Sequence, residues 1–519
     1  MSVWVRITLS FLLGSTTLSA ADPVKHKGNV ANTNLMAKPA EGALENHLDL
    51  SYLTPDRDIA YVEPDHPSYS ARVNVHRPPG NGPFPCLLVI HGGGYFGGDK
   101  DSAAFHSLCE AAIKRGYVTV NVGYIKGLNI HPQVQRDFKE LVRWLRANAE
   151  RFSIDSERIG AWGFSAGGWL ASSSAMSTVD DVGTRSIRSV RLTEYLRNPG
   201  TNNGRLYVPF DAAAPNHASL SSRINVIIAD FHHSEGRLTP DDPIVATYVG
   251  LGVEKGISHE SFQQAGVPLV EIELSEEQTR GKGNWHVPDL TQTVNSRAGN
   301  KKVSLRDRMF EFLEVHLKGS QTRTSPPEAR PNRRIFSKKT SVSLIAASPR
   351  ATIHYTTDDS KPTADSPVYV KPFSISETTT IRAFAIVPGM QPSGAITCDF
   401  IRGEVPPKIS SPAKLPIARV GKPYSIQFKA DADSAIWDIA FQTRSVFGRK
   451  DLSPEKREQL TEEIRAKGSG SAQVGLTFDR KKGALTGTPT REGVHVVQIR
   501  AARGPRSAAS DRTYILHIK

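Results

Sequence analysis

Apolar, strand-like runs alternate with helical segments over residues 46–320, and this alternation constrains the fold more than any other feature. The strand-like runs are residues 72–76, 85–90, 117–122, 158–162, 224–229, 244–249 and 269–274. Helical patterns occupy residues 102–115 and 133–149, a segment that starts at Ser165, and residues 305–318. Strands separated by helices are typical of a mostly parallel sheet that is covered by helices on both faces. We therefore expect an α/β domain here, with the polar stretch 178–221 as an insertion.

The pattern changes after residue 320. Residues 321–334 are rich in Pro, Arg and Thr without an apolar period, which predicts a linker. Short strand-like runs without helices follow, with a second break near residue 403. The fold class expected is α/β followed by two all-β domains, namely β-sandwiches at 335–402 and 403–519.

The N-terminal 21 residues have the pattern of a secretory signal peptide. Arg6 precedes a short apolar run from Ile7 to about Leu18, and small residues follow at the expected cleavage site. A membrane anchor is the alternative interpretation. We expect a secreted or periplasmic protein in which residues 22–45 form an N-terminal linker and no transmembrane segment remains. Three scattered cysteines do not make a disulfide framework, so buried free thiols are expected, with a Cys86–Cys109 pair as the alternative.

A G-x-S-x-G motif directly follows one of the predicted strands. It runs from Gly163 through Ser165 to Gly167, and a helical pattern comes after it. In a nucleophile elbow the chain turns so sharply that the flanking residues must be small, and the serine hydroxyl is lifted above the sheet. Ser165 is therefore the candidate nucleophile, and the amide of Ala166 is a candidate oxyanion-hole donor.

Three consecutive glycines follow the strand that ends at Ile90. A chain segment without side chains can approach a substrate oxygen and present N–H donors to it. The amides of Gly93 and Gly94, together with that of Ala166, are thus the expected oxyanion hole. Alone, the glycines would indicate only a tight turn. Because they occur in the right order with the elbow, they favour an acyl-transfer site.

A serine nucleophile needs a base, which is expected later in the chain. His286 lies after the predicted strand 269–274 and before the last helix of the domain, where the base belongs. His316 falls within that helix, which favours a packing or surface role. His232, His233 and Glu235 could line the pocket, decorate a loop or hold a metal ion, although their spacing is generic.

The acid that orients the base is expected after a strand between the serine and the histidine. Glu254 occupies that position after strand 244–249. Asp230, at the end of the preceding strand, is the alternative. Asp241 and Asp242 precede strand 244–249 and would lie at the opposite edge of the sheet.

Residues 46–320 resemble the α/β-hydrolase fold, in particular secreted acetyl xylan and feruloyl esterases. The resemblance rests on the segments 85–95, 131–137, 142–148, 158–168 and 312–318. It implies a triad of Ser165, His286 and an acid, with no cofactor and no metal. Two departures concern the triad. The family usually has Asp where Glu254 stands, and its base often lies in a Gly-His-Gly-like context, whereas His286 lies between Trp285 and Val287.

The tail resembles two other families. Residues 353–362, 367–369 and 380–384 are similar to the small β-sandwich of chitobiase and β-hexosaminidase chains. Residues 476–490 resemble Ig-like domains with a Gly-Thr-Pro-Thr turn. Such modules are commonly spacers or adhesion elements, and no row of exposed aromatic residues for stacking on sugars is evident.

The resemblances together imply a serine esterase that acts on acylated polysaccharide, with acetyl groups favoured over feruloyl groups. The formal charge of +13 comes from 65 Lys and Arg against 52 Asp and Glu. No basic block with interleaved aromatic residues indicates nucleic-acid binding. Two alternatives stay open: a peptidase-like serine hydrolase, and a non-catalytic member of the fold that binds carbohydrate or another partner.

Overall fold

The structure is a computed structural model. It describes residues 56–62, 70–95, 97–126, 132–176, 181–183, 190–191, 208–209, 217–229, 242–249, 262, 264, 267, 269–273, 290–332, 334–412, 414–432, 435–442, 471–504 and 507–519. No helix within these ranges is both long and apolar enough to cross a membrane.

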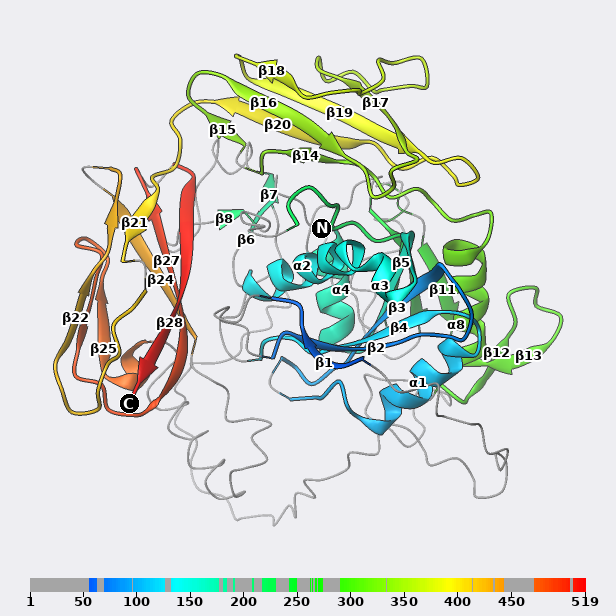
Figure 1. Ribbon diagram of the computed structural model, residues 1–519, viewed down its shortest axis with the longest axis horizontal. Coiled ribbons are helices and arrows are strands. Elements are labelled where there is room, and N and C mark those ends of the chain that lie inside the picture. Colours follow the sequence, from blue (N-terminus) through cyan, green and yellow to red (C-terminus); the bar gives the residue numbers. More distant parts are fainter. Residues whose placement is uncertain are drawn as a thin grey trace, which may run out of the picture.

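An eight-stranded sheet organises the first domain (Figure 1). Its order is β1 (Asp56–Ala60), β2 (Arg72–His76), β4 (Val118–Val122), β3 (Phe84–Ile90), β5 (Ile154–Gly163), β9 (Val226–Ala229), β10 (Ile244–Val249) and β11 (Leu269–Glu273). Strand β2 is antiparallel to both of its neighbours, and the six strands from β4 to β11 are parallel to one another. This topology is that of an α/β hydrolase, and the predicted mostly parallel sheet is confirmed.

Helices cover both faces of this sheet and bury two separate cores. On one face, α2 (Gln133–Ala147) and α4 (Ala166–Met176) pack against Leu88, Val120 and Ala161. On the other face, α1 (Ala103–Ile113) and α8 (Leu305–Leu313) pack against Leu87 and Trp162. The remaining described elements of this domain are α3 (Ala149–Phe152), β6 (Asp181–Gly183), β7 (Val190–Arg191), β8 (Val208–Pro209), β12 (Thr293–Asn295), β13 (Lys302–Ser304) and the π-helical turn η2 (Glu314–Lys318). Strands whose faces are both buried carry nearly continuous apolar runs, which is why the sequence revealed them.

A first β-sandwich follows the hydrolase domain. One sheet has the order β14 (Glu328–Arg330), β16 (Thr340–Ile345) and β18 (Phe373–Ile375). The other has the order β15 (Ile335–Phe336), β20 (Ile396–Arg402), β19 (Thr379–Ile386) and β17 (Thr352–Thr356). Alternate residues of β19, such as Ile381 and Ala383, are fully buried between the sheets.

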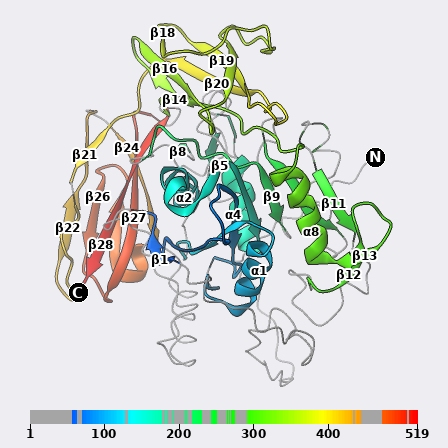
Figure 2. The ribbon, with the colours of Figure 1, turned by 45° about the vertical axis from the view of Figure 1, so that its right-hand side comes forward.

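The last domain is a second sandwich with its own core around Trp437, Phe428 and Tyr514. Its largest sheet consists of β24 (Ile436–Gln442), β27 (Gly493–Ala502) and β28 (Ala509–Ile518), all antiparallel. The other described elements are β21 (Ile409–Ser411), β22 (Tyr424–Gln427), β23 (Lys429–Ala430), the 3-10 turn η3 (Ser471–Val474), β25 (Leu476–Asp479) and β26 (Ala484–Gly487). Both views show this sandwich beside α2, while the first sandwich covers another side of the hydrolase domain (Figures 1 and 2).

The segment predicted as a linker, residues 321–334, is packed into the structure. Thr322, Thr324 and Ser325 are almost fully buried. Backbone hydrogen bonds join Thr322 and Thr324 to Gln391 at 2.9 and 2.8 Å, and β14 pairs with β16. The described part of this segment therefore belongs to the fold and is not a solvated tether.

Helix α2 is buried over almost its whole circumference, although its sequence is amphipathic. Only Trp144 and Ala147 escape the buried class. Near the C-terminal end of the helix, Arg143 approaches Glu328 of β14, which also accepts hydrogen bonds from Ser221 and Ser222. Burial would raise the pKa of Glu328, but Arg330 and Arg143 hold it well below its usual range. The polar face of α2 is thus an interface with the appended domains.

Candidate active site

Ser165 occupies a sharp turn between β5 and α4. Its φ is +49°, a left-handed conformation that is uncommon outside glycine. The turn is held by hydrogen bonds from Gly167 N to Phe164 O at 2.8 Å and from Trp169 N to Ser165 O at 3.0 Å. Ser165 is half-buried and Ala166 is buried at the start of the helix. This is the geometry expected of a nucleophile elbow.

The two glycines of the motif are required by close backbone contacts. A Cβ atom on Gly163 would lie 2.4 Å from Gly167 O, and one on Gly167 would lie 2.4 Å from Ile90 O. Both distances are about 1 Å shorter than an ordinary contact. The small residues therefore let α4 start directly against the ends of β5 and β3.

Residues 91–95, here called the glycine loop, lie against the elbow. Strands β3 and β5 are parallel neighbours with Ile90 opposite Gly163, so both motifs leave the sheet at its carboxyl edge. Phe164 N donates to Ile90 O at 3.0 Å, and a Cβ atom on Gly92 would lie only 3.1 Å from that of Ser165. The predicted juxtaposition of the serine with the glycines is thus observed.

Gly93 and Gly94 have φ values of +117° and +60°, respectively. The loop is closed by a 2.8 Å hydrogen bond from Gly97 N to Gly93 O, and a Cβ atom on Gly93 would collide with Gly97 at 2.4 Å. Gly93 and Gly94 are exposed to solvent beside the half-buried serine. Backbone N–H groups in such a setting can stabilise the negative charge that develops on a carbonyl oxygen during acyl transfer.

A buried tyrosine fixes the start of the glycine loop. Tyr124, which follows β4, donates its hydroxyl hydrogen to His91 O at 2.8 Å, and its ring stacks on the His91 ring at 4.3 Å. Tyr61 makes a similar bond one residue away, to Gly123 O at 3.0 Å. Sequence reasoning missed both tyrosines, because only the fold brings residues 33 and 62 positions apart into contact.

His91 is a structural member of the loop. Its side chain is buried, and its Nδ1 lies 2.7 Å from Gly92 O, so a neutral ring protonated on Nδ1 donates to that carbonyl. Burial lowers the pKa of His91 to about 4, an effect that the bond to Gly92 only partly offsets. The imidazole is therefore neutral at pH 7, and its contacts hold the loop.

Two aromatic side chains flank the elbow. Tyr95, at the end of the glycine loop, and Trp169, on the first turn of α4, meet edge to face at 5.3 Å between ring centroids. Trp169 is half-buried. The sequence motifs predicted no role for either residue, because an aromatic side chain beside a motif does not indicate a particular function.

His286, Glu254 and the alternative acid Asp230 lie outside the described residues, as do His232, His233, Glu235 and Asp241. Strands β9, β10 and β11 are parallel to β5, so their carboxyl ends lie at the same edge of the sheet as Ser165. Asp242 precedes β10 and is buried, at the opposite edge as expected. His316 lies in η2 with its ring 4.9 Å from that of Phe312.

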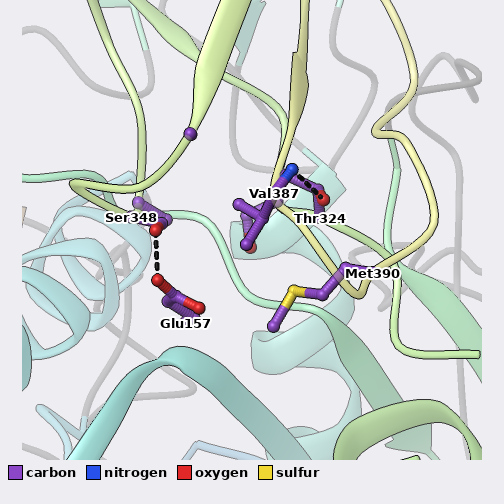
Figure 3. A pocket seen from close by; sticks show the side chains of 8 residues that line it. Glu157, Thr324, Ser348, Val387 and Met390 are labelled. Carbon is purple, nitrogen blue, oxygen red and sulfur yellow. Dashed lines mark hydrogen bonds between the residues drawn. The ribbon is translucent and has the colours of Figure 1, made fainter. Parts of the chain in front are cut away.

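Buried thiols and a small pocket lie away from this site. Cys86, Cys109 and Cys398 are all buried thiols, as predicted. The pocket in Figure 3 lies between the hydrolase domain and the first sandwich, where Ser348 donates to Glu157 near the start of β5. Because β5 ends at the elbow, this pocket is at the amino edge of the sheet, opposite Ser165. Among the described residues, no group of three or more His, Cys, Asp or Glu side chains is arranged to hold a metal ion.

Comparison with known families supports two of the sequence resemblances. Residues 73–205 match the BD-FAE family of α/β-hydrolase esterases, and residues 331–398 match the chitobiase/beta-hexosaminidase C-terminal domain. Both resemblances inferred from the sequence are confirmed over these ranges. The resemblance of the last domain to Ig-like domains stays a prediction.

Several curated proteins are similar over part of the chain. An ethyl acetate hydrolase of Pseudomonas putida is 36% identical over 104 residues, which is 19% of this chain and 32% of the relative. A versiconal hemiacetal acetate esterase of Dothistroma septosporum is 36% identical over 92 residues, 17% of this chain and 27% of the relative. An endo-1,4-beta-xylanase B of Butyrivibrio fibrisolvens is 32% identical over 102 residues, 19% and 15% of the two chains. The chain thus spans a third or less of the length of these relatives.

Solved structures with a similar fold include a truncated carbohydrate esterase from gut microbiota. It is 16% identical with a TM-score of 0.37, covering 51% of this chain and 96% of that one. Esterase Est2 of the planctomycete Thermogutta terrifontis is 17% identical with a TM-score of 0.33, covering 46% and 84%.

Proposed function

We propose that the protein is a serine esterase that hydrolyses carboxylic esters through an acyl-enzyme. The observation that carries the proposal is the strained Ser165 at the carboxyl edge, with the exposed amides of the glycine loop packed beside it. Similarity to the BD-FAE family over residues 73–205 supports the same reaction class, as does similarity to two curated ester hydrolases over 104 and 92 residues.

In the proposed first step, the Oγ atom of Ser165 forms a bond to the ester carbonyl carbon while His286 takes the hydroxyl proton. The amides of Gly93, Gly94 and Ala166 donate to the oxyanion. The bond to the leaving oxygen then breaks, and the alcohol departs with the proton from His286. Water, deprotonated by the same imidazole, attacks the acyl carbon. The bond from that carbon to Oγ of Ser165 then breaks, the imidazolium returns its proton to Oγ, and the acid is released.

Glu254 is proposed to hold the imidazolium that forms in each step, with Asp230 as the alternative acid. The distinction is testable, because the amide variant of the true acid leaves the imidazole without its orienting charge. Glu254→Gln and Asp230→Asn should therefore differ by orders of magnitude in kcat on one aryl acetate. Equal activity of the two variants would contradict both assignments.

The proposed natural substrate is an acylated polysaccharide, with acetyl favoured over feruloyl groups, met outside the cytoplasm after export by the N-terminal 21 residues. Similarity to a carbohydrate esterase fold and to a domain found in chitobiase chains motivates this choice, which is made by analogy.

Hydrolysis of a short aryl acetate by the purified protein tests the reaction class. Ser165→Ala should abolish the activity, whereas the matched control Ser172→Ala should retain it. Ser172 lies on the same helix and bonds only the Gly168 carbonyl among the described partners, at 2.9 Å. A folded wild-type protein without activity on acetate and longer esters would contradict the proposal and favour a non-catalytic binding scaffold.

A further inference from the structure

Two asparagines interrupt the apolar runs of two neighbouring strands of the hydrolase sheet. Asn74 in β2 and Asn121 in β4 lie directly opposite each other in the register, and both side chains are buried. Burying an amide side chain is costly unless its polar atoms are hydrogen-bonded. The hydrogen bonds of these two side chains should therefore account for their presence in the sheet.

Both amide groups hold the same segment, residues 97–102, here called the support loop. Asn121 Nδ2 donates to Lys100 O at 3.0 Å. Asn74 Nδ2 donates to the Asp101 carboxylate at 2.6 Å. The Oδ1 atom of Asn121 accepts from a thiol of α1, and that of Asn74 accepts from a backbone N–H of β1 at 2.9 Å. Each amide is thus bonded at both ends, which fixes its orientation.

The support loop in turn packs on the glycine loop. Gly97 N donates to Gly93 O at 2.8 Å. Gly98 has a φ of +83°, and a Cβ atom on it would lie 2.1 Å from Gly92 O and 2.3 Å from His91 Nδ1. The two loops therefore touch through their backbones, at two successive carbonyl groups of the glycine loop.

These contacts orient the peptide units that carry two of the proposed oxyanion donors. A trans peptide unit is planar, so its N–H points away from its C=O. The unit with the Gly93 carbonyl carries the Gly94 N–H, and its oxygen accepts the bond from the support loop. The unit with the Gly92 carbonyl carries the Gly93 N–H. Its oxygen is held by His91 Nδ1 at 2.7 Å and by the close approach of Gly98.

We propose that Asn74 and Asn121 are positioning residues for the oxyanion hole. They hold the support loop on the sheet, and the support loop aligns the two donor peptide units of the glycine loop beside Ser165. The contacts continue to the elbow, because a Cβ atom on Gly92 would lie 3.1 Å from that of Ser165. This inference rests on the proposed esterase function and deepens it. Since the oxyanion forms only in the transition state, misaligned donors should lower kcat and leave KM unchanged.

Asn121→Ala removes the support, and Asn225→Ala is the matched control. Asn225 is also buried and bonded at both ends of its amide, to Ile159 N and Arg323 O at 2.9 Å each. It directly precedes β9 at the amino edge of the sheet, opposite the elbow. The two variants should therefore lose similar stability in urea titrations, whereas only Asn121→Ala should affect the reaction.

With p-nitrophenyl acetate, kcat of Asn121→Ala should fall about tenfold to a hundredfold, less than or equal to the loss of one oxyanion donor, at nearly constant KM. Asn225→Ala should keep both constants. Should Asn121→Ala fail to fold, Asn74→Ala removes the other hydrogen bond to the support loop and should lower kcat in the same way.

Gly98→Ala perturbs the support loop from its other side. The new Cβ atom would lie 2.1 Å from Gly92 O, so the peptide unit with the Gly93 N–H must move. Gly389→Ala, in a turn of the first sandwich, is the matched control. Its φ of +85° is nearly the same, but no atom lies within 4 Å of the new Cβ position. Both variants carry the same backbone strain, and only Gly98→Ala should lower kcat, by about tenfold or more.

Hydrogen exchange, followed by mass spectrometry on peptides that span residues 90–102, separates this proposal from the esterase proposal. Support-loop amides should exchange severalfold faster in Asn121→Ala than in the wild type, and at the wild-type rate in Asn225→Ala. If the wild-type protein hydrolyses no ester, the esterase proposal fails, while this measurement still decides whether the asparagines hold the loop. Unchanged exchange, unchanged kcat in folded Asn121→Ala, or an equal kcat loss in Asn225→Ala would overturn the positioning role.

Discussion

Replacing Tyr124 with phenylalanine would remove one hydroxyl from the support of the glycine loop and keep the ring that stacks on His91. The lost bond is the 2.8 Å contact to His91 O, in a fully buried setting. An intramolecular hydrogen bond contributes about 1 kcal/mol net, and a buried carbonyl left without its donor costs about 1–3 kcal/mol. We therefore expect the free energy of unfolding, measured by urea titration, to fall by about 1–3 kcal/mol.

The catalytic consequence follows if the glycine-loop amides stabilise the oxyanion. A loss of about 1 kcal/mol of transition-state stabilisation lowers kcat about fivefold at 25 °C. Tyr61→Phe is the matched control, because it removes a buried hydroxyl that donates to Gly123 O at 3.0 Å. Gly123 directly precedes Tyr124, and the Tyr61 bond does not reach the glycine loop itself. It should lose similar stability and keep kcat. If Tyr124→Phe retains full kcat on an aryl acetate, or if the control loses as much, the loop is not positioned in this way.

Three other perturbations have defined outcomes. Gly167→Ala would place a Cβ atom 2.4 Å from the carbonyl oxygen at the end of β3, and the displaced elbow should lower kcat about a hundredfold. The control Gly403→Ala, where the nearest atom would be 3.8 Å away, should leave kcat unchanged. The folded-state pKa of His91 is about 4, against 6.5 for the free side chain, so between these pH values the unfolded chain binds more protons than the folded one. The free energy of unfolding should therefore fall by about 3 kcal/mol as the pH drops from 6.5 to 4. The slope of unfolding free energy against pH should be shallower in His91→Gln, and equal slopes would contradict the assignment. Arg136 of α2 donates to the Asp511 carboxylate of the last sandwich at 2.5 Å, and both side chains are more than 90% buried. Asp511→Ala leaves Arg136 buried without this carboxylate and should lower the free energy of unfolding by about 3–5 kcal/mol in chemical denaturation. The double variant Arg136→Met/Asp511→Leu should recover most of that stability. A cost below about 1 kcal/mol for Asp511→Ala would show that the ion pair does not fix the interface.

The hydrolase fold was predictable because its determinants are local in sequence. Buried parallel strands carry unbroken apolar runs, and the predicted strands match the observed β2, β3, β4 and β10 to within one residue. The elbow and the glycine loop were predictable for a related reason. Each is a short motif whose backbone conformation only glycine or a strained residue can adopt.

The buried tyrosine hydrogen bonds near the site were not predictable from periodicity. Tyr124 and Tyr61 read as ordinary aromatic residues, and their roles depend on which carbonyl oxygen the fold places within 3 Å of each hydroxyl. The surroundings of α2 were also hidden. An amphipathic pattern predicts a solvated polar face, but Arg136 and Arg143 find their carboxylate partners more than 180 residues later in the chain.

Helix α2 belongs to the hydrolase domain and contacts both sandwiches, which bears on how the protein unfolds when it is heated. Its apolar side belongs to the hydrolase core, Arg143 approaches Glu328 in β14 of the first sandwich, and Arg136 pairs with Asp511 of the last sandwich. If one domain unfolded alone, Arg136 or Arg143 would lose its carboxylate partner while its side chain stayed buried in the rest of the protein. The described domains should therefore lose their structure together, as a single calorimetric peak whose van't Hoff and calorimetric enthalpies agree. What divides into modules along the sequence would then behave as one thermodynamic unit.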